Sequence, residues 1–279
     1  MLEFAFMRKA LVAGLMLSIM IPMIGIIMVN RKTSMIGDAL SHTALSGVGL
    51  GLILGFDPLV GSAIVCVVAA FLIELIRKKF PQYGDMATAV IMSTGLGIAA
   101  ILSDFAPGGN SFESYLFGSI SSVTNRDVIN ISVIFVLILV VSISQYSGLL
   151  AISIDKNIAR LAGVKVNRIN AIFTFLSAIT IALAVKIVGA LMVTSLIVLP
   201  VATALIIAKS YKKTYIITII LGILYMMLGI VQSYQFDIKP GGAIVVNAVI
   251  GMIVFVAYSK IKQPNRKNFS NSRNNAKIK

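Results

Sequence analysis

The chain has 279 residues, of which 58% are hydrophobic and 12% are charged, and its mean hydropathy is +0.98. The charged fraction is about half that of an ordinary soluble domain, which argues against a soluble enzyme and indicates a polytopic helical membrane protein. The formal net charge of +14 does not indicate nucleic-acid binding, because the Lys and Arg residues fall between apolar runs, as they do in the cytoplasmic loops of membrane proteins.

Nine apolar segments are long enough to cross a bilayer as helices of about 20 residues each. In chain order they are 10–29, 37–55, 59–76, 86–102, 128–145, two segments within 169–208, 214–233 and 243–258. Lys186 and Gly189 predict a turn that divides the run 169–208 into a sixth and a seventh span. We therefore expect an all-α protein with about nine, that is eight to nine, transmembrane helices over 1–260.

Two connections between the spans carry further signals. Residues 103–127 form the longest polar connection, and the segment 115–118 within it is too short to span, so we expect a surface or re-entrant piece. Glu74 lies three and four residues before Arg77 and Lys78, which predicts a local ion pair at the end of the third span. The tail, 261–279, is basic and rich in Asn, and we expect it to be disordered.

The distribution of basic residues predicts the orientation of the chain. With nine spans, nineteen of the 24 Lys and Arg residues fall on one side of the membrane. The positive-inside rule places that side, which includes the C-terminus, in the cytoplasm. Arg8 and Lys9 lie on the other side, against the rule.

Asp38 and His42 are the most unusual residues of the second span. His42 is the only histidine, and a spacing of four places both side chains on one face of a helix. A carboxylate and an imidazole form a partial ligand set for Mn, Fe or Zn, and two copies of the chain about a two-fold axis would supply four ligands. The alternative is structural: Asp38 caps the helix and His42 forms a hydrogen bond inside the bundle.

Other residues have simpler interpretations. Gly47, Gly51 and Gly55 recur every four residues and predict close helix packing. Asp85 and Asp237 are secondary candidates for the ion path, and a helix cap or a turn cap is the preferred explanation of each. Charge at helical spacing over 153–166 predicts a short amphipathic helix outside the bilayer that is available to a partner.

Signatures of catalysis are missing. The chain has no phosphate-binding loop of the form Gly-x-x-x-x-Gly-Lys-Ser/Thr, and a single histidine excludes a His-Glu-x-x-His site. The single cysteine, Cys66, lies in an apolar run and is interpreted as a packing residue. We therefore expect a transport protein rather than an enzyme.

Five segments, in this order along the chain, resemble the permease subunits of zinc, manganese and iron ABC importers. They are Gly37-Asp38-Ala39-Leu40-Ser41-His42, Leu116-Phe117-Gly118-Ser119-Ile120, Ala159-Arg160-Leu161-Ala162-Gly163, Val188-Gly189-Ala190-Leu191-Met192-Val193 and Pro200-Val201-Ala202-Thr203-Ala204. The resemblance implies a homodimeric permease in the cell membrane, two cytoplasmic ATP-binding subunits and an extracytoplasmic metal-binding protein. It also implies that a divalent Mn, Zn or Fe ion is transported, that ATP binds to the partner subunits, and that this chain holds no cofactor.

By the same resemblance, Asp38 and His42 line the metal path. The basic loop of Arg31 and Lys32 before the second span places the pair in the inner part of the membrane. The helix of 153–166, with Asp155, Ala159, Arg160 and Gly163, would couple the spans to the ATPase. The main alternative is an ATP-independent secondary carrier that uses Asp38 and His42 as a relay, and a third is a membrane-embedded enzyme or an assembly subunit. The helix of 153–166 discriminates among them, because a carrier does not need a docking helix.

Overall fold

The computed structural model describes residues 3–106 and 109–262, and this part of the chain is helical throughout, without strands. Nine helices are long. They are α1 (Ala5–Asn30), α2 (Met35–Leu54), α3 (Pro58–Lys79), α4 (Gly84–Phe105), α6 (Asn125–Ser144), α9 (Val166–Val188), α10 (Ala190–Ile207), α11 (Tyr211–Phe236) and α12 (Pro240–Lys262). Four short helices connect them: η1 (Pro81–Tyr83), α5 (Gly109–Phe117), α7 (Tyr146–Ile154) and α8 (Lys156–Leu161). Each predicted span corresponds to one long helix.

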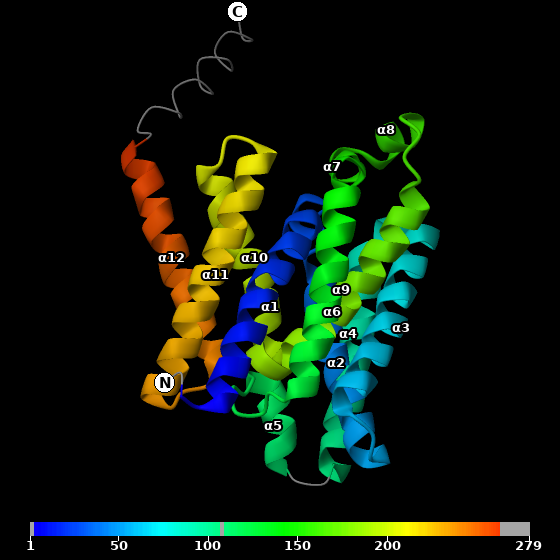
Figure 1. Ribbon diagram of the computed structural model, residues 1–279. Helices are drawn as coiled ribbons and strands as arrows, with labels where there is room; N and C mark the ends of the chain where they lie inside the picture. The colour runs from blue at the N-terminus through cyan, green and yellow to red at the C-terminus, as the bar shows by residue number, and fades with distance from the viewer. Residues whose placement is uncertain (1–2, 107–108, 263–279) are drawn as a thin grey trace, which may run out of the picture.

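The long helices run alternately up and down in one bundle (Figure 1). The N-terminus and α5 lie at one end, whereas α7, α8 and the end of α12 lie at the other. The turns α1–α2, α3–α4 and α10–α11 also lie at this second end, which therefore carries most of the basic residues. We call it the basic end. Because the nine long helices alternate in direction, the start of α1 and the end of α12 lie at opposite ends.

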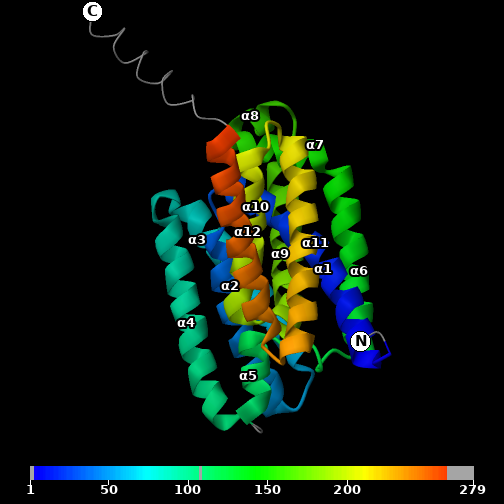
Figure 2. The ribbon, with the colours of Figure 1, turned by 90° about the vertical axis from the view of Figure 1, so that its left-hand side faces the viewer.

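α1 and α9 form the centre of the bundle. Most residues of both helices are buried, whereas α4, α6 and α12 are buried along a narrow face only. The outer helices expose large apolar side chains such as Ile101, Ile143 and Ile253. In water such surfaces would aggregate, but in a bilayer they face lipid. Figure 2 shows α4 at one edge of the bundle, with α2 behind α12 in the interior.

Eight of the long helices in the described residues are apolar enough to cross a membrane by composition, and α2 is the exception. It carries Asp38 and His42 together with several Ser, Thr and Gly residues. Its neighbours are α3, α4, α10 and α9, so most of its polar groups meet other helices and avoid the cost of facing lipid. The low hydropathy of α2 thus reflects its place inside the bundle.

Three segments meet closely at the end opposite the basic end. Gly118 follows α5, Gly189 separates α9 from α10, and Gly241 is the second residue of α12. A Cβ atom on Gly189 would collide with the Phe117 carbonyl carbon, and one on Gly241 with the Val188 carbonyl oxygen. Gly189 has φ +91°, which only glycine adopts at low cost. The structure confirms the predicted turn near Lys186 and Gly189. Position 189 requires glycine because a Cβ atom would collide with Phe117 and because the backbone there has a positive φ.

Beside this junction a buried ion pair joins two helices. Lys186 Nζ lies 2.7 Å from Asp127 Oδ2, with side-chain exposures of 13% and 5%. Asp127 also completes a capping box with Thr124 at the start of α6. Lys186 therefore has a structural partner on α6 and does not simply mark a solvated turn.

Some predicted boundaries were wrong. The helix expected over 153–166 is shorter: α8 covers Lys156–Leu161, α7 ends at Ile154, and residues 162–165 form the turn into α9. α12 continues to Lys262, past the expected limit of the membrane domain at 260. The rest of the predicted disordered tail, 263–279, lies outside the described residues. Residues 115–117 of the segment 115–118 form the end of α5, a nine-residue helix, and Gly118 follows it.

Candidate functional site

Asp38 and His42 lie on one face of α2, near its start at the basic end. Asp38 belongs to the first turn, and His42 Nε2 lies 3.7 Å from Asp38 Oδ1. Their side chains are 31% and 15% exposed, so the face is partly open rather than sealed in the core. The spacing of four residues explains this proximity directly.

Thr194 of α10 fixes the orientation of the Asp38 carboxylate. Its Oγ1 donates a hydrogen bond of 2.8 Å to Asp38 Oδ1. The hydrogen bond of Asp38 is thus made to a neighbouring helix, not to the backbone of α2, which weakens the interpretation of Asp38 as a cap. Gly37 makes this approach possible, because the space for its missing Cβ holds Cδ1 of Ile197 from the same helix α10.

One imidazole nitrogen of His42 makes no hydrogen bond. Nδ1 is buried and has no hydrogen-bond partner among the described residues. Buried polar atoms are usually satisfied, so an unpaired nitrogen beside a carboxylate is the arrangement expected of a ligand site. It does not fit the alternative in which His42 makes a hydrogen bond inside the bundle.

The two side chains make only a partial metal site. Across residues 3–106 and 109–262 no three His, Cys, Asp or Glu side chains cluster closely enough to hold an ion. One carboxylate and one imidazole would bind a first-row divalent ion weakly and would need ligands from water or a second chain. Weak coordination suits an ion that must also leave.

Two of the three predicted packing glycines lie against α3. A Cβ on Gly47 would collide with the carbonyl oxygen of Gly61, and one on Gly51 would lie 2.7 Å from the Cα of Pro58. Gly55 is different: it ends α2 with φ +76° and has no neighbour within 4 Å of its Cβ position. Within the described residues Gly55 therefore contacts no other helix at its Cβ position, and its left-handed backbone terminates α2.

The two further acidic candidates do not join the pair. Asp85 is exposed in the first turn of α4. Asp237 is exposed at the end of α11, with φ +51°, on the opposite end of the bundle from Asp38. Neither forms a ligand cluster with Asp38 and His42 among the described residues.

The four residues expected in the coupling helix have distinct structural roles. Asp155 caps α8 by accepting hydrogen bonds from the backbone N–H groups of Asn157 and Ile158. Ala159 is fully buried against α7 and α9, and Gly163, with φ +81°, begins the turn that follows α8. Arg160 is exposed. The cap and the buried alanine fix α8 on the bundle.

The exposed surface of α8 carries two large aliphatic side chains beside the polar Lys156, Asn157 and Arg160. Ile158 is 64% exposed and Leu161 is 89% exposed. Figure 1 shows α8 at the far edge of the basic end, beyond the long helices. A six-residue helix that presents two aliphatic side chains outward is typical of a docking element.

The sequence did not predict two long-range contacts, Thr194 with Asp38 and Lys186 with Asp127. Nothing in the sequence marks Thr194, because a threonine in an apolar helix is common. Asp127 had a signal, since Thr124 and Asp127 have the spacing of a capping box, and Lys186 was visible as a charge within an apolar run. Their pairing across 59 residues was not predictable from either signal.

The comparisons with known proteins agree along almost the whole chain. Residues 3–259 match the family model described as "ABC 3 transport family". The chain is 32% identical to the "Probable metal transport system membrane protein" of Treponema pallidum, over 94% of this chain and 98% of the relative. It is 30% identical to the manganese import system permease protein ScaB of Streptococcus gordonii, over 95% and 96%. Among solved structures, PsaBC from Streptococcus pneumoniae in complex with Fab superposes with a TM-score of 0.81 and 27% identity, covering 91% of each chain.

Proposed function

The chain belongs to the ABC 3 transport family, and from this membership we propose that it is the membrane permease subunit of an ATP-driven importer of a divalent metal ion. The relatives named for metal and manganese transport match it over nearly their full lengths. Further relatives are named for zinc and for iron transport. The transported ion is therefore Mn, Zn or Fe.

Asp38 and His42 form one ion-binding position along the transport path. The observation that carries this assignment is their arrangement on the partly open face of α2, with one buried imidazole nitrogen unpaired. Because one chain supplies two ligands, a homodimer that apposes the two α2 faces would complete the coordination. The positive-inside rule places the basic end, and with it Asp38 and the C-terminus, toward the cytoplasm.

ATP hydrolysis belongs to a separate subunit that docks on α8. The exposed Ile158 and Leu161 give such a partner an apolar contact, and the family membership supplies the class of partner. An extracytoplasmic metal-binding protein would deliver the ion to the opposite end. An ATP-independent carrier, the alternative considered from sequence, leaves this docking element without a purpose.

The test is metal uptake into proteoliposomes by the complex of this chain with its ATPase and delivery protein. We expect Asp38→Ala and His42→Ala each to lose most ATP-dependent uptake while the protein remains folded. Asp85→Ala is the matched control, because Asp85 is also an acidic residue in the first turn of a long helix but lies outside the pair. Normal uptake by both site variants would refute the site, whereas uptake without ATP would refute the importer mechanism.

A further inference from the structure

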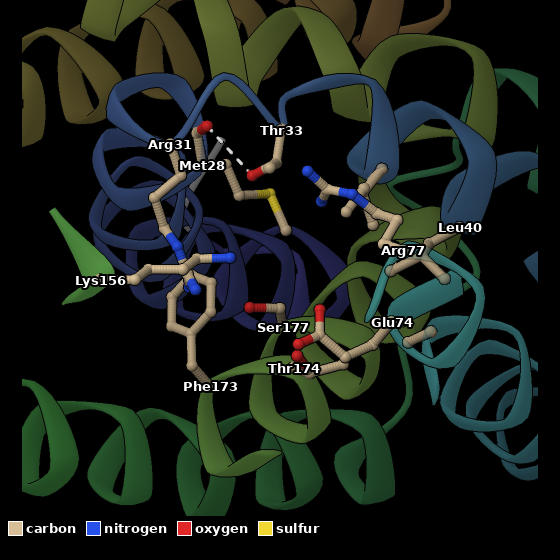
Figure 3. A pocket seen from close by; sticks show the side chains of 12 residues that line it. Met28, Arg31, Thr33, Leu40, Glu74, Arg77, Lys156, Phe173, Thr174 and Ser177 are labelled. Atoms are coloured by element: carbon tan, nitrogen blue, oxygen red, sulfur yellow. Dashed lines mark hydrogen bonds between the residues drawn. The ribbon is translucent and has the colours of Figure 1, made fainter. Parts of the chain in front are cut away.

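A second polar site lies at the basic end, in a pocket between the α1–α2 turn, α3, α8 and α9 (Figure 3). The pocket is small, with a cavity volume of about 30 Å³, and it opens to solvent. Its charged side chains are Arg31, Arg77, Lys156 and Glu74. We call it the Arg31 pocket. Three cations from three different elements face one carboxylate.

The single carboxylate does not neutralise these cations. Glu74 Oε1 lies 3.7 Å from Lys78 Nζ, and Lys78 does not line the pocket. Within the described part of the chain, none of the three pocket cations lies within 4.0 Å of a carboxylate oxygen. Like charges brought together in a partly buried site are unfavourable unless an anion joins them.

Arg31 is held in place with unused hydrogen-bonding capacity. Its Nη2 donates to Asn170 Oδ1 at 2.6 Å, and its guanidinium lies 5.8 Å from the centroid of the Phe173 ring. These contacts orient the planar group without neutralising its charge. The Nε atom is buried and has no partner among the described residues. A guanidinium with a free donor is the side chain best suited to binding phosphate oxygens.

Ser177 of α9 supplies a second unused donor. The side chain is 1% exposed, and its hydroxyl has no hydrogen-bond partner among the described residues. Figure 3 shows this hydroxyl in the middle of the pocket, with Arg31 and Lys156 on one side and Arg77 and Glu74 on the other. A buried hydroxyl of this kind is expected to bind a ligand or an ordered water.

The charge of the Arg31 pocket selects the class of ligand. A divalent metal would be repelled by three cations, so the pocket is not a continuation of the Asp38 path. The three cations outnumber the single carboxylate, and this excess of positive charge favours an anionic ligand. Partial burial lowers the pKa of Lys156, and the charge of Arg31 lowers it further, whereas the Glu74 carboxylate raises it.

We propose that the Arg31 pocket binds a phosphate group, supplied either as inorganic phosphate or as the headgroup of an anionic phospholipid in the adjoining leaflet. Arg31 directly precedes the turn into α2, and Lys156 is the first residue of α8. A bound phosphate group would therefore tie the docking helix to the start of the helix that carries Asp38. The binding itself depends only on the pocket and not on the transported ion.

The test uses the full chain in two settings that separate the two sources. In detergent without phospholipid, thermal unfolding is followed while inorganic phosphate is titrated against chloride at constant ionic strength. In parallel, the chain is placed in phosphatidylcholine nanodiscs with and without phosphatidylglycerol, and the retained lipid is identified by native mass spectrometry. A ligand that binds only the folded state raises the unfolding temperature, and the rise grows with the logarithm of its concentration above Kd.

The variants are Arg77→Gln and Lys156→Gln, with Arg168→Gln as the matched control. Arg168 is an exposed arginine of α9 that does not line the pocket. We expect the two pocket variants to bind about tenfold more weakly, the loss of one charged hydrogen bond, and the control to bind as the unmodified chain does. Arg77 and Lys156 are chosen for substitution instead of Arg31, because Arg31→Gln would also remove the hydrogen bond to Asn170 and so disturb the structure.

Stabilisation by inorganic phosphate in detergent would assign the free anion, and selective retention of phosphatidylglycerol would assign the lipid headgroup. Two results would overturn the proposal. One is that neither source stabilises the chain beyond the chloride reference. The other is that Arg77→Gln and Lys156→Gln bind the effective source as tightly as Arg168→Gln, because binding would then occur elsewhere.

Discussion

The two oxygens of Asp38 have different surroundings. Oδ1 accepts the Thr194 hydroxyl at 2.8 Å and faces His42 Nε2 at 3.7 Å, whereas Oδ2 has no partner among the described residues. The hydroxyl thus selects one rotamer of the carboxylate and leaves an oxygen free. In the proposed ion path, a carboxylate held in advance in this way would not have to be ordered when the ion arrives.

Thr194→Val removes this hydroxyl while keeping the shape of the side chain. We expect metal uptake to fall severalfold, because the carboxylate loses its fixed orientation, whereas the free energy of unfolding falls by only about 1 kcal/mol. Thr194→Ser retains the hydroxyl and should restore most of the uptake. The measurements are ATP-dependent uptake in proteoliposomes and thermal unfolding of each variant. Equal uptake by Thr194→Val and the unmodified chain would show that Thr194 does not position Asp38.

At the scale of helices, local sequence patterns predict which segments form helices. The contacts between separate helices determine which side chains meet. The nine long helices follow from apolar length, and α2 was included among them although its composition is the least apolar. The Asp38–His42 pair also follows from spacing within one helix. By contrast, Thr194 and the Lys186–Asp127 pair depend on how separate helices are rotated and shifted against each other, which no local pattern encodes.

The same reason explains why the Arg31 pocket was not foreseen. Arg31 and Arg77 entered the sequence argument only as basic residues that orient the chain. Glu74 was expected to pair with Arg77 or Lys78, and the structure pairs it with Lys78. Arg77 is thereby left for the pocket, where it meets side chains from α1–α2, α8 and α9.

The Lys186–Asp127 ion pair makes α9 and α6 dependent on each other. Lys186→Met would leave the Asp127 carboxylate buried without its cation, and we expect a loss of about 3–5 kcal/mol in the free energy of unfolding. The double variant Asp127→Asn, Lys186→Met should be more stable than Lys186→Met alone, because the asparagine carbonyl still accepts from the Thr124 backbone and no charge is left unpaired. Thermal unfolding in detergent measures both. A double variant less stable than the single one would contradict this account.

The outer face of α8 gives a second prediction at this scale. Leu161→Glu places a charge on the most exposed aliphatic side chain of the helix, so the ATPase subunit should no longer copurify with the permease. Asn167→Glu is the matched control, since it adds the same carboxylate to an exposed position six residues away. Because Leu161 has few contacts within the chain, folding should be unaffected. Undiminished copurification with Leu161→Glu would place the docking surface elsewhere.

For the whole molecule, the nine crossings and the basic end lead to one testable topology. The chain has a single cysteine, Cys66, which is buried in α3, so Cys66→Ala gives a background without thiols. Leu161→Cys then marks the basic end and Lys239→Cys the opposite end. Both positions are well exposed, at 89% and 56%. A membrane-impermeant maleimide should label Lys239→Cys in intact cells and label Leu161→Cys only after the membrane is opened.

This labelling pattern is the point on which the proposed mechanism depends most. ATP is available in the cytoplasm, so α8 can serve as a docking element only if the basic end faces inward. In that orientation Asp38 and His42 lie near the cytoplasmic exit of the ion path, and the Arg31 pocket faces the inner leaflet, where anionic lipid and free phosphate are both present. The reverse pattern would place α8 outside the cell and refute the docking role, while the geometry of the Asp38 and Arg31 sites would stand unchanged. The two outcomes therefore separate the orientation from the chemistry.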